Sequence, residues 1–379
     1  MDRKKFLYTP WGFTIEGNDL WFVPVGINML CKYNLLTKRI EKTVTFPDMS
    51  IEHWGAYNVK KFENYIVTVP AFERNIYMYD STNDTVTKID LEVKEYNPEF
   101  FLDCSYWKGQ IYFFPITYNC VIKVSLIDRS VTEIPLINGE KMFCSCIQVN
   151  QNTYLTNETG NIICFDMERE EFRYIEIDAR EHLNNVVLQD ENKLIISNGG
   201  KIIYIYDITS GHKAKKELPI KGNFGRISYC QEKLYLFPKG VTEEILVVNL
   251  KSLGVTMLSL KNRLKLPYDS EMVRNIKLFS IPIIVNNKIY VMKDLQGLYI
   301  IDVLSGVVTD TLIELEEMSE EQFEYFYNFI KEKGVFAESV FPFATMDFFV
   351  HNVEKKFEEK NQKSLKSIGK LIYETISLR

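Results

Sequence analysis

The stretch GQIYFFPITYNCVIKVSL, residues 109–126, consists of two short apolar segments separated by a polar turn. Apolar and aromatic residues alternating with polar ones over this length are typical of half-buried strands. The first segment carries Pro115 near its end, and the second closes on Ser125. Similar phrases return at residues 64–81, 232–250 and 287–303. This recurrence predicts a repeat architecture.

A polar residue closes the second strand of every phrase. It is found at Asn34, Asp80, Ser125, Asp166, Asp207, Asn249 and Asp302. The intervals between these positions are 46, 45, 41, 41, 42 and 53 residues. A tight polar turn precedes each phrase, and a second turn and a further β-rich run follow it. The turns are rich in Asn, Gly and Asp, which tolerate positive φ in hairpins. The pattern therefore predicts four strands per unit and seven units.

A four-stranded unit of about 40–45 residues is typical of a β-propeller blade, which buries both faces against its neighbours. We predict an all-β, seven-bladed β-propeller of four-stranded antiparallel blades over residues 1–315. Four prolines take one equivalent position near the end of the second strand: Pro24, Pro70, Pro115 and Pro238. Because proline cannot donate to a strand ladder, its recurrence predicts a strand end or a β-bulge there.

The spacing resembles that of seven-bladed propellers of the kelch-like or NHL-like kind, in a loose sense. Kelch blades usually carry a Gly-Gly pair after the second strand, and only Gly199-Gly200 matches this feature. The Trp-Asp mark of WD40 blades is absent from the sequence, and a Gly-His pair occurs once, at Gly211-His212, without recurring from unit to unit. The resemblance therefore implies the architecture and no particular family.

The sequence changes character in the last part of the chain, residues 316–379. Ser319 and Gln322 form a capping-box arrangement, and apolar residues follow at helical spacing on Phe323, Phe326 and Ile330. We predict a small C-terminal helical appendix. Its apolar stripes either pack against its own chain or form a partner-binding or dimerising module.

Composition restricts the classes of function. The chain has 379 residues, a net charge of −6 and 13% aromatic residues, which suit a pleated β surface. No basic face for nucleic acid is evident, and no apolar run is long enough to cross a membrane. Seven cysteines without paired spacing and an N-terminus without an apolar signal segment lead us to expect a cytoplasmic protein without disulfides.

Standard catalytic and cofactor motifs are missing from the sequence. Cys144 and Cys146 lie within an apolar strand run, whereas structural zinc prefers cysteine pairs on turns. We therefore expect buried thiols that act as small apolar side chains, no metal site and no cofactor.

In a propeller, the connections between blades and the loops between second and third strands open on one face, here called the loop face. The hairpin turns form the opposite turn face. Loops on a rigid scaffold usually carry function, and aromatic and arginine side chains dominate binding hot spots. We predict a ligand-binding set on the loop face made of Trp54, Arg74, Tyr118, Arg180, Tyr268 and Arg274. Arg226 is expected in an interblade loop near them.

Three functions stay open on the sequence. The first is a binding module for a peptide, a protein partner or a small ligand, without nucleic acid or membrane. The second is a propeller enzyme of lyase, hydrolase or cyclase type, with His53 and His182 at the channel mouth as weak catalytic candidates. The third is a structural assembly subunit.

Overall fold

The computed structural model describes residues 12–313 apart from several segments. The segments outside the described residues are 25–28, 47–55, 72–73, 92–100, 137–142, 158, 178, 180–182, 223, 239–243, 261–278, 294–296 and 312. The predicted helical appendix and the predicted domain boundary after residue 315 lie outside the described residues. Nothing within the described ranges forms a helix that could span a membrane.

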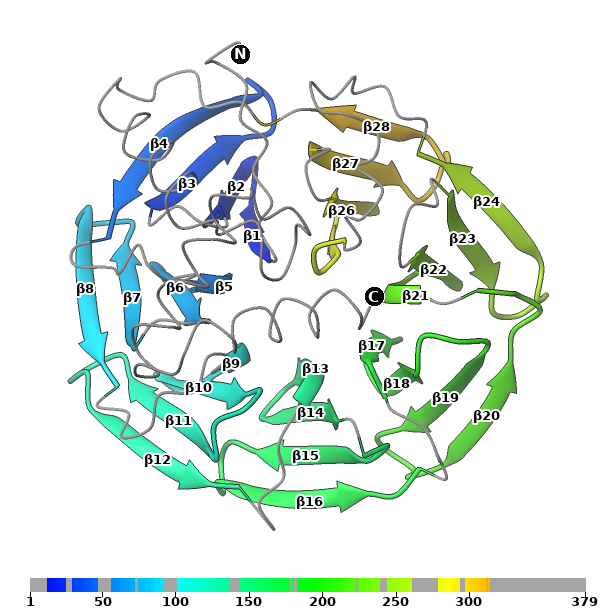
Figure 1. The fold of residues 1–379 in the computed structure, drawn as a ribbon, viewed down its shortest axis with the longest axis horizontal. Helices are drawn as coiled ribbons and strands as arrows, with labels where there is room; N and C mark the ends of the chain where they lie inside the picture. Colours follow the sequence, from blue (N-terminus) through cyan, green and yellow to red (C-terminus); the bar gives the residue numbers. More distant parts are fainter. Residues whose placement is uncertain are drawn as a thin grey trace, which may run out of the picture. The chain divides into compact units, whose positions relative to one another are not determined.

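Seven four-stranded antiparallel sheets form the blades of a β-propeller, which confirms the predicted fold (Figure 1). We number the blades 1 to 7 in chain order. Blade 1 contains β1 (Phe13–Glu16), β2 (Asp19–Phe22), β3 (Met29–Asn34) and β4 (Arg39–Thr45). Blade 2 contains β5 (Ala56–Phe62), β6 (Tyr65–Pro70), β7 (Asn75–Asp80) and β8 (Thr85–Asp90). Blade 3 contains β9 (Phe101–Trp107), β10 (Gln110–Pro115), β11 (Cys120–Ser125) and β12 (Val131–Pro135).

The remaining blades follow the same order from the centre of the ring to its rim. Blade 4 contains β13 (Phe143–Val149), β14 (Asn152–Asn157), β15 (Ile162–Asp166) and β16 (Glu171–Ile175), and blade 5 contains β17 (Asn185–Gln189), β18 (Lys193–Ser197), β19 (Ile202–Asp207) and β20 (Lys213–Glu217). Blade 6 contains β21 (Phe224–Cys230), β22 (Lys233–Pro238), β23 (Glu244–Asn249) and β24 (Val255–Ser259). Blade 7 contains β25 (Ile283–Val285), β26 (Lys288–Lys293), β27 (Gly297–Asp302) and β28 (Val308–Thr311).

Strand β10, in the stretch 109–126, shows how a blade buries both of its faces. Ile111 and Phe113 pack in an apolar cluster shared with blade 2, whereas Tyr112 and Phe114 pack in a cluster shared with blade 4. Alternate residues of a strand point to opposite faces, so a near-continuous apolar run serves two neighbours at once. The outermost strand β12 is mostly exposed and accordingly mixes polar and apolar residues. The hydrophobic core therefore lies between blades and not within any one of them.

The ring closes between blades 1 and 7 without an exchanged strand among the described residues. Every blade is built from four consecutive strands, and β1 contacts β25. Across this seam the Tyr33 hydroxyl lies 3.5 Å from the Thr311 hydroxyl, at hydrogen-bond distance. Packing between the blades, and not a shared sheet, thus joins the first and last repeats.

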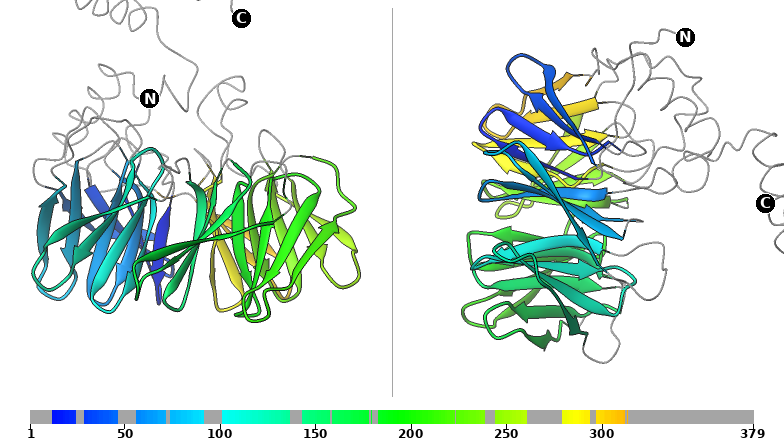
Figure 2. Two further views of the ribbon diagram at one scale, coloured as in Figure 1. Left: turned by 90° about the horizontal axis from the view of Figure 1, so that it is seen from below. Right: turned by 90° about the vertical axis from the view of Figure 1, so that its left-hand side faces the viewer.

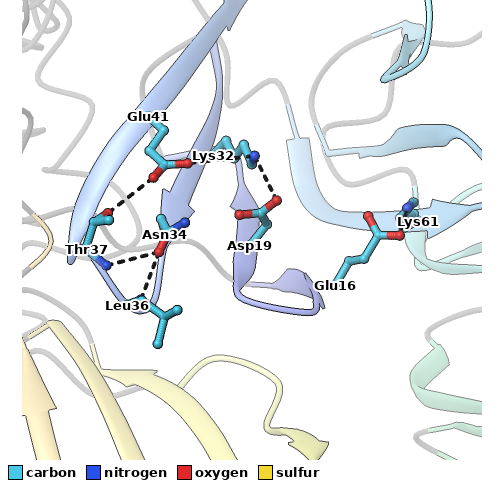
Figure 3. A network of polar contacts seen from close by, with 8 residues as sticks. All are labelled: Glu16, Asp19, Lys32, Asn34, Leu36, Thr37, Glu41 and Lys61. Atoms are coloured by element: carbon cyan, nitrogen blue, oxygen red, sulfur yellow. Dashed lines mark hydrogen bonds and ion pairs between the residues drawn. The ribbon is translucent and has the colours of Figure 1, made fainter.

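The closing polar residue of each phrase ends the third strand and binds the backbone of the turn that follows. In blade 1, Asn34 Oδ1 accepts hydrogen bonds from the backbone N–H groups of Leu36 at 2.9 Å and Thr37 at 3.0 Å (Figure 3). The equivalent bonds recur at the other six positions, Asp80, Ser125, Asp166, Asp207, Asn249 and Asp302. The predicted seven-fold repeat is therefore confirmed at the level of single hydrogen bonds.

The same turns contain one residue in the left-handed region in every blade. These residues are Lys38, Asp84, Arg129, Glu170, Gly211, Leu253 and Gly306, with φ between 55° and 72°. Only two of them are glycine, so the cap formed by the closing residue stabilises a conformation that side chains otherwise disfavour. Figure 2 shows these hairpin turns together on the turn face.

Replacing a closing residue by alanine should destabilise the fold. Asn249 Oδ1 accepts from the N–H groups of Lys251 at 2.9 Å and Ser252 at 2.8 Å. We expect Asn249→Ala to lower the free energy of unfolding by about 1 kcal/mol, as for loss of an equivalent side-chain cap on a helix. Urea denaturation measures the change. Asn249→Asp keeps the acceptor and is the control; an equal loss in both variants would contradict the role of the cap.

Candidate functional site

A cavity of about 440 Å³ lies at the centre of the ring, among the innermost strands of blades 2 to 7. Its walls come from β5, β9, β13, β17, β21 and the segment 281–284 at β25. Figure 1 shows β5, β9, β13, β17 and β21 as the innermost strands of their blades. The polar and thiol side chains among the lining residues are Lys60, Asp103, Cys104, Ser105, Cys144, Ser145, Cys146, Gln148, Asn185, Arg226, Ser228 and Tyr229. Sheets that pack face to face in a ring leave only strand edges at the centre, so a cavity there follows from the fold.

β-Bulges near the start of the innermost strand set the direction of the polar side chains. In four blades the register shifts by one residue there, and the residue after the extra one is polar: Asn58, Asp103, Ser145 and Arg226. The shift faces Pro70, Pro115 and Pro238 in three of these blades. The predicted association of these prolines with a strand end or bulge is thus confirmed for them. Bulges commonly redirect side chains beside functional sites.

Asp103 is the centre of a buried polar cluster between blades 2 and 3. It is 5% exposed, and its Oδ1 accepts from Asn58 Nδ2 at 3.1 Å and from the Cys104 backbone N–H at 2.9 Å. Its Oδ2 lies 3.0 Å from Lys60 Nζ in an ion pair. The carboxylate therefore has donors on both oxygens, which repays part of its cost of burial.

The charge of Lys60 is stabilised by this arrangement. Burial acts to lower its pKa, but attraction by the Asp103 carboxylate and the hydrogen bond to it outweigh burial and place the pKa above its ordinary value. Lys60 consequently stays protonated at neutral pH and cannot act there as a nucleophile or a base.

Removing the carboxylate should be costly because it leaves a lysine charge in the cavity without its partner. We expect Asp103→Ala to lower the free energy of unfolding by about 3 kcal/mol and Asp103→Asn, which keeps one acceptor, by less. Chemical denaturation provides the measurement. The surface pair Lys201–Glu217 is the control, since Lys201→Ala should change stability much less. Equal effects of Asp103→Ala and Lys201→Ala would contradict a structural role for the buried pair.

The thiols beside this pair are held in the neutral form. Desolvation, and then the Asp103 carboxylate, raise the pKa of Cys104 and of Cys146 well above the usual value. The thiolate is the reactive form of cysteine, so both side chains are poor nucleophiles at neutral pH.

Slow alkylation is the expected consequence for these two cysteines. In the folded protein at pH 7.5, we expect Cys104 and Cys146 to react with iodoacetamide far more slowly than a free thiol, because a raised pKa leaves little thiolate. Peptide mass spectrometry after timed quenching measures the rates, and the same protein in urea is the control. Rapid labelling of either residue in the folded protein would be inconsistent with the neutral thiols.

Other polar groups of the lining are matched to one another across blades. Gln148 Oε1 accepts from the Tyr106 N–H at 3.0 Å, and Gln148 Nε2 donates to the Tyr106 carbonyl at 2.7 Å. Thr153 Oγ1 donates to Ser105 Oγ at 2.9 Å. These contacts join blade 4 to blade 3, so they are explained by the assembly of the ring.

Two donors in the lining have no hydrogen-bond partner in the described structure. They are Arg226 Nε, on β21, and Asn185 Nδ2, on the neighbouring strand β17. Asn185 is only 3% exposed. An unpaired buried N–H costs free energy, so each such group in a folded protein calls for an explanation.

Only two of the six predicted binding residues fall within the described ranges. Tyr118 packs beside Phe101, with ring centroids 6.1 Å apart, and its hydroxyl donates to Glu133 Oε1 at 2.5 Å. Arg74 is exposed before β7. The others are outside the described residues, as are the two histidine candidates: Trp54, Arg180, Tyr268, Arg274, His53 and His182.

The predicted position of Arg226 in an interblade loop is wrong. Arg226 belongs to strand β21, and it lines the central cavity. Sequence reasoning also missed Lys60, Asp103 and Asn185. A signal was present: Asp103 interrupts the apolar run FFLDC, where a carboxylate requires a buried partner. The partner itself is 43 residues away in another blade, at Lys60.

The described residues contain no group of three or more His, Cys, Asp or Glu side chains arranged to hold a metal ion. All seven cysteines lie in strands as free thiols.

The fold and the central cavity define this protein as a seven-bladed β-propeller whose central cavity has both polar and apolar lining residues. No protein-family model matches the chain, and no curated protein matches it by sequence. Among solved structures, virginiamycin B lyase from Staphylococcus aureus is similar, with a TM-score of 0.59 and 13% identity over 77% of this chain and 95% of that chain.

Two further solved propellers are similar at the same level. BamB from Moraxella catarrhalis has a TM-score of 0.52 and 9% identity, over 78% of this chain and 85% of that chain. PorZ from Porphyromonas gingivalis, an essential surface component of the type-IX secretion system, has a TM-score of 0.57 and 10% identity, over 83% of this chain and 39% of that chain. At these identities the similarity shows a shared fold alone.

Proposed function

We propose that this propeller is a non-enzymatic binding module whose ligand enters the central cavity from the loop face. One observation carries the proposal: two residues that line the cavity, Arg226 and Asn185, each carry a buried N–H group without a partner in the described structure. A bound ligand that accepts hydrogen bonds would satisfy both groups. Small-molecule sites typically combine a concave, partly apolar wall with a few convergent polar groups in this way.

The protonation states in the cavity favour binding over catalysis. Lys60 is held charged, and the thiols of Cys104 and Cys146 are held neutral. The Asp103 carboxylate is occupied by three donors, from Asn58, Lys60 and its own strand. Protonated Lys60 has no lone pair to offer and the neutral thiols are poor nucleophiles, so these three groups are unsuited to act as nucleophile or general base.

The similarity to solved propellers does not distinguish a binding module from an enzyme. They include a lyase and a component of a secretion system, so the fold serves both chemistry and assembly. The proposal therefore depends on the groups inside the cavity. A peptide or protein partner is compatible with it where a terminal or side-chain group of that partner enters the cavity.

A cavity-filling variant tests the proposal. Native mass spectrometry of the protein with a mixed library of small acids, amines, neutral compounds and short peptides should show at least one compound bound at 1:1 and recovered unchanged. Ile281 lines the cavity, and we expect Ile281→Trp to reduce this binding about tenfold or more by occupying the space.

Ile127→Trp on the turn face is the matched control, because Ile127 is 88% exposed in the outer hairpin turn between β11 and β12 and is not among the lining residues. It should bind as the wild type does. Melting temperatures check that both variants fold. The proposal fails if no compound binds, if Ile281→Trp binds as well as Ile127→Trp, or if the bound compound is recovered chemically altered in excess over the protein.

A further inference from the structure

The chemistry of the unpartnered groups defines the ligand more closely, and this inference rests on the binding function proposed above. Both groups are N–H donors, and no unpartnered acceptor of a lining residue accompanies them among the described side chains. A ligand that satisfies them must therefore present acceptor oxygens. A ligand that only donates, such as an ammonium group, would leave both unsatisfied.

The charged side chains that line the cavity indicate the sign of the ligand's charge. The described acidic and basic side chains among the lining residues are Lys60, Asp103 and Arg226. Lys60 and Asp103 neutralise one another at 3.0 Å. Arg226 has no carboxylate partner among the described residues, so one positive charge remains in the cavity. A single negative charge on the ligand balances it.

The shape of a carboxylate matches these two donors. Guanidinium groups bind planar carboxylates with directed, charge-assisted hydrogen bonds, and a second oxygen is free to accept from an amide. Arg226 and Asn185 lie on adjacent innermost strands, β21 and β17, which are in contact. Both residues therefore belong to neighbouring strands of the cavity wall.

The part of the wall that blade 7 contributes, next to blade 6, is apolar. Ile281, Pro282, Ile283 and Ile284 form a continuous apolar segment that lines the same cavity. About 440 Å³ accommodates more than a carboxylate alone. The wall thus favours an anion with an apolar body over a small inorganic ion, which would leave the isoleucines without a partner.

We propose that the central cavity binds a small organic acid, with Arg226 and Asn185 donating to its carboxylate and the segment 281–284 contacting its apolar part. The ligand is a monocarboxylate with a compact apolar or aromatic body. Its carboxylate occupies the buried donors left open by the protein, and its body fills the apolar side of the cavity.

Matched acids and amides test the assignment. The probes are benzoate and phenylacetate, with benzamide and phenylacetamide as neutral counterparts of the same shape, and inorganic phosphate as an anion without an apolar body. Isothermal titration calorimetry on the full chain should show that at least one acid binds about tenfold or more tightly than its amide, because the charge-assisted bonds to Arg226 are lost in the amide. Phosphate should bind more weakly than the acid.

Substitutions of the donors identify the site. Arg226→Gln should weaken binding of the acid about tenfold or more and leave the amide nearly unchanged. Asn185→Leu, close in volume, should weaken the acid to a smaller extent. The control is Arg169→Gln, since Arg169 is exposed in a hairpin turn of blade 4 and should leave binding unchanged. Circular dichroism and melting temperatures verify that the variants are folded.

The outcomes separate this inference from the binding function. If the amides bind as tightly as the acids, or if Arg226→Gln retains full affinity for the acid, the carboxylate assignment is wrong. If none of these probes binds while Ile281→Trp still abolishes binding of a library compound, the assignment is also wrong and the binding function stands. If nothing binds the wild-type cavity in either experiment, both proposals fail.

Discussion

Apolar packing between neighbouring blades is the interaction on which the rest of this structure depends. Within the described ranges no blade shows a core of its own, because six apolar clusters each draw their side chains from two adjacent sheets. A sheet with two apolar faces is stable only between two others, and seven of them satisfy this requirement by closing into a ring. The ring in turn leaves a space at its centre that the edges of the innermost strands cannot fill.

The contents of that central space follow from the same packing. Apolar side chains of the innermost strands contribute to the clusters between blades. In four blades a β-bulge interrupts the alternation of this strand, and the residue after the extra one is polar. Asp103 and Lys60 are paired across the boundary between blades, so one polar contact stabilises the assembly. Arg226 and Asn185 each carry a buried N–H group without a partner in the described structure, and the proposed binding function rests on these two groups.

Local sequence features predicted the propeller correctly because a blade is encoded locally. The interval between closing residues, the polar turns and the proline positions all act within one hairpin, and the structure places each closing residue at the end of a third strand. The predicted binding residues were chosen by residue type on the loops, and most of these lie outside the described ranges. Arg226 was assigned to a loop because the sequence does not show where the innermost strand begins.

The sequence by itself determined the number of blades, the strand order within each blade and the side-chain cap of every outer hairpin. These properties depend on periodicity, turn chemistry and hydrogen bonds that span only two or three residues. Only the tertiary structure decided that Lys60 meets Asp103 and that Asn185 and Arg226 line one cavity. Ring closure brings these residues together from different blades. A local sequence pattern does not show which positions far apart in the chain will be in contact.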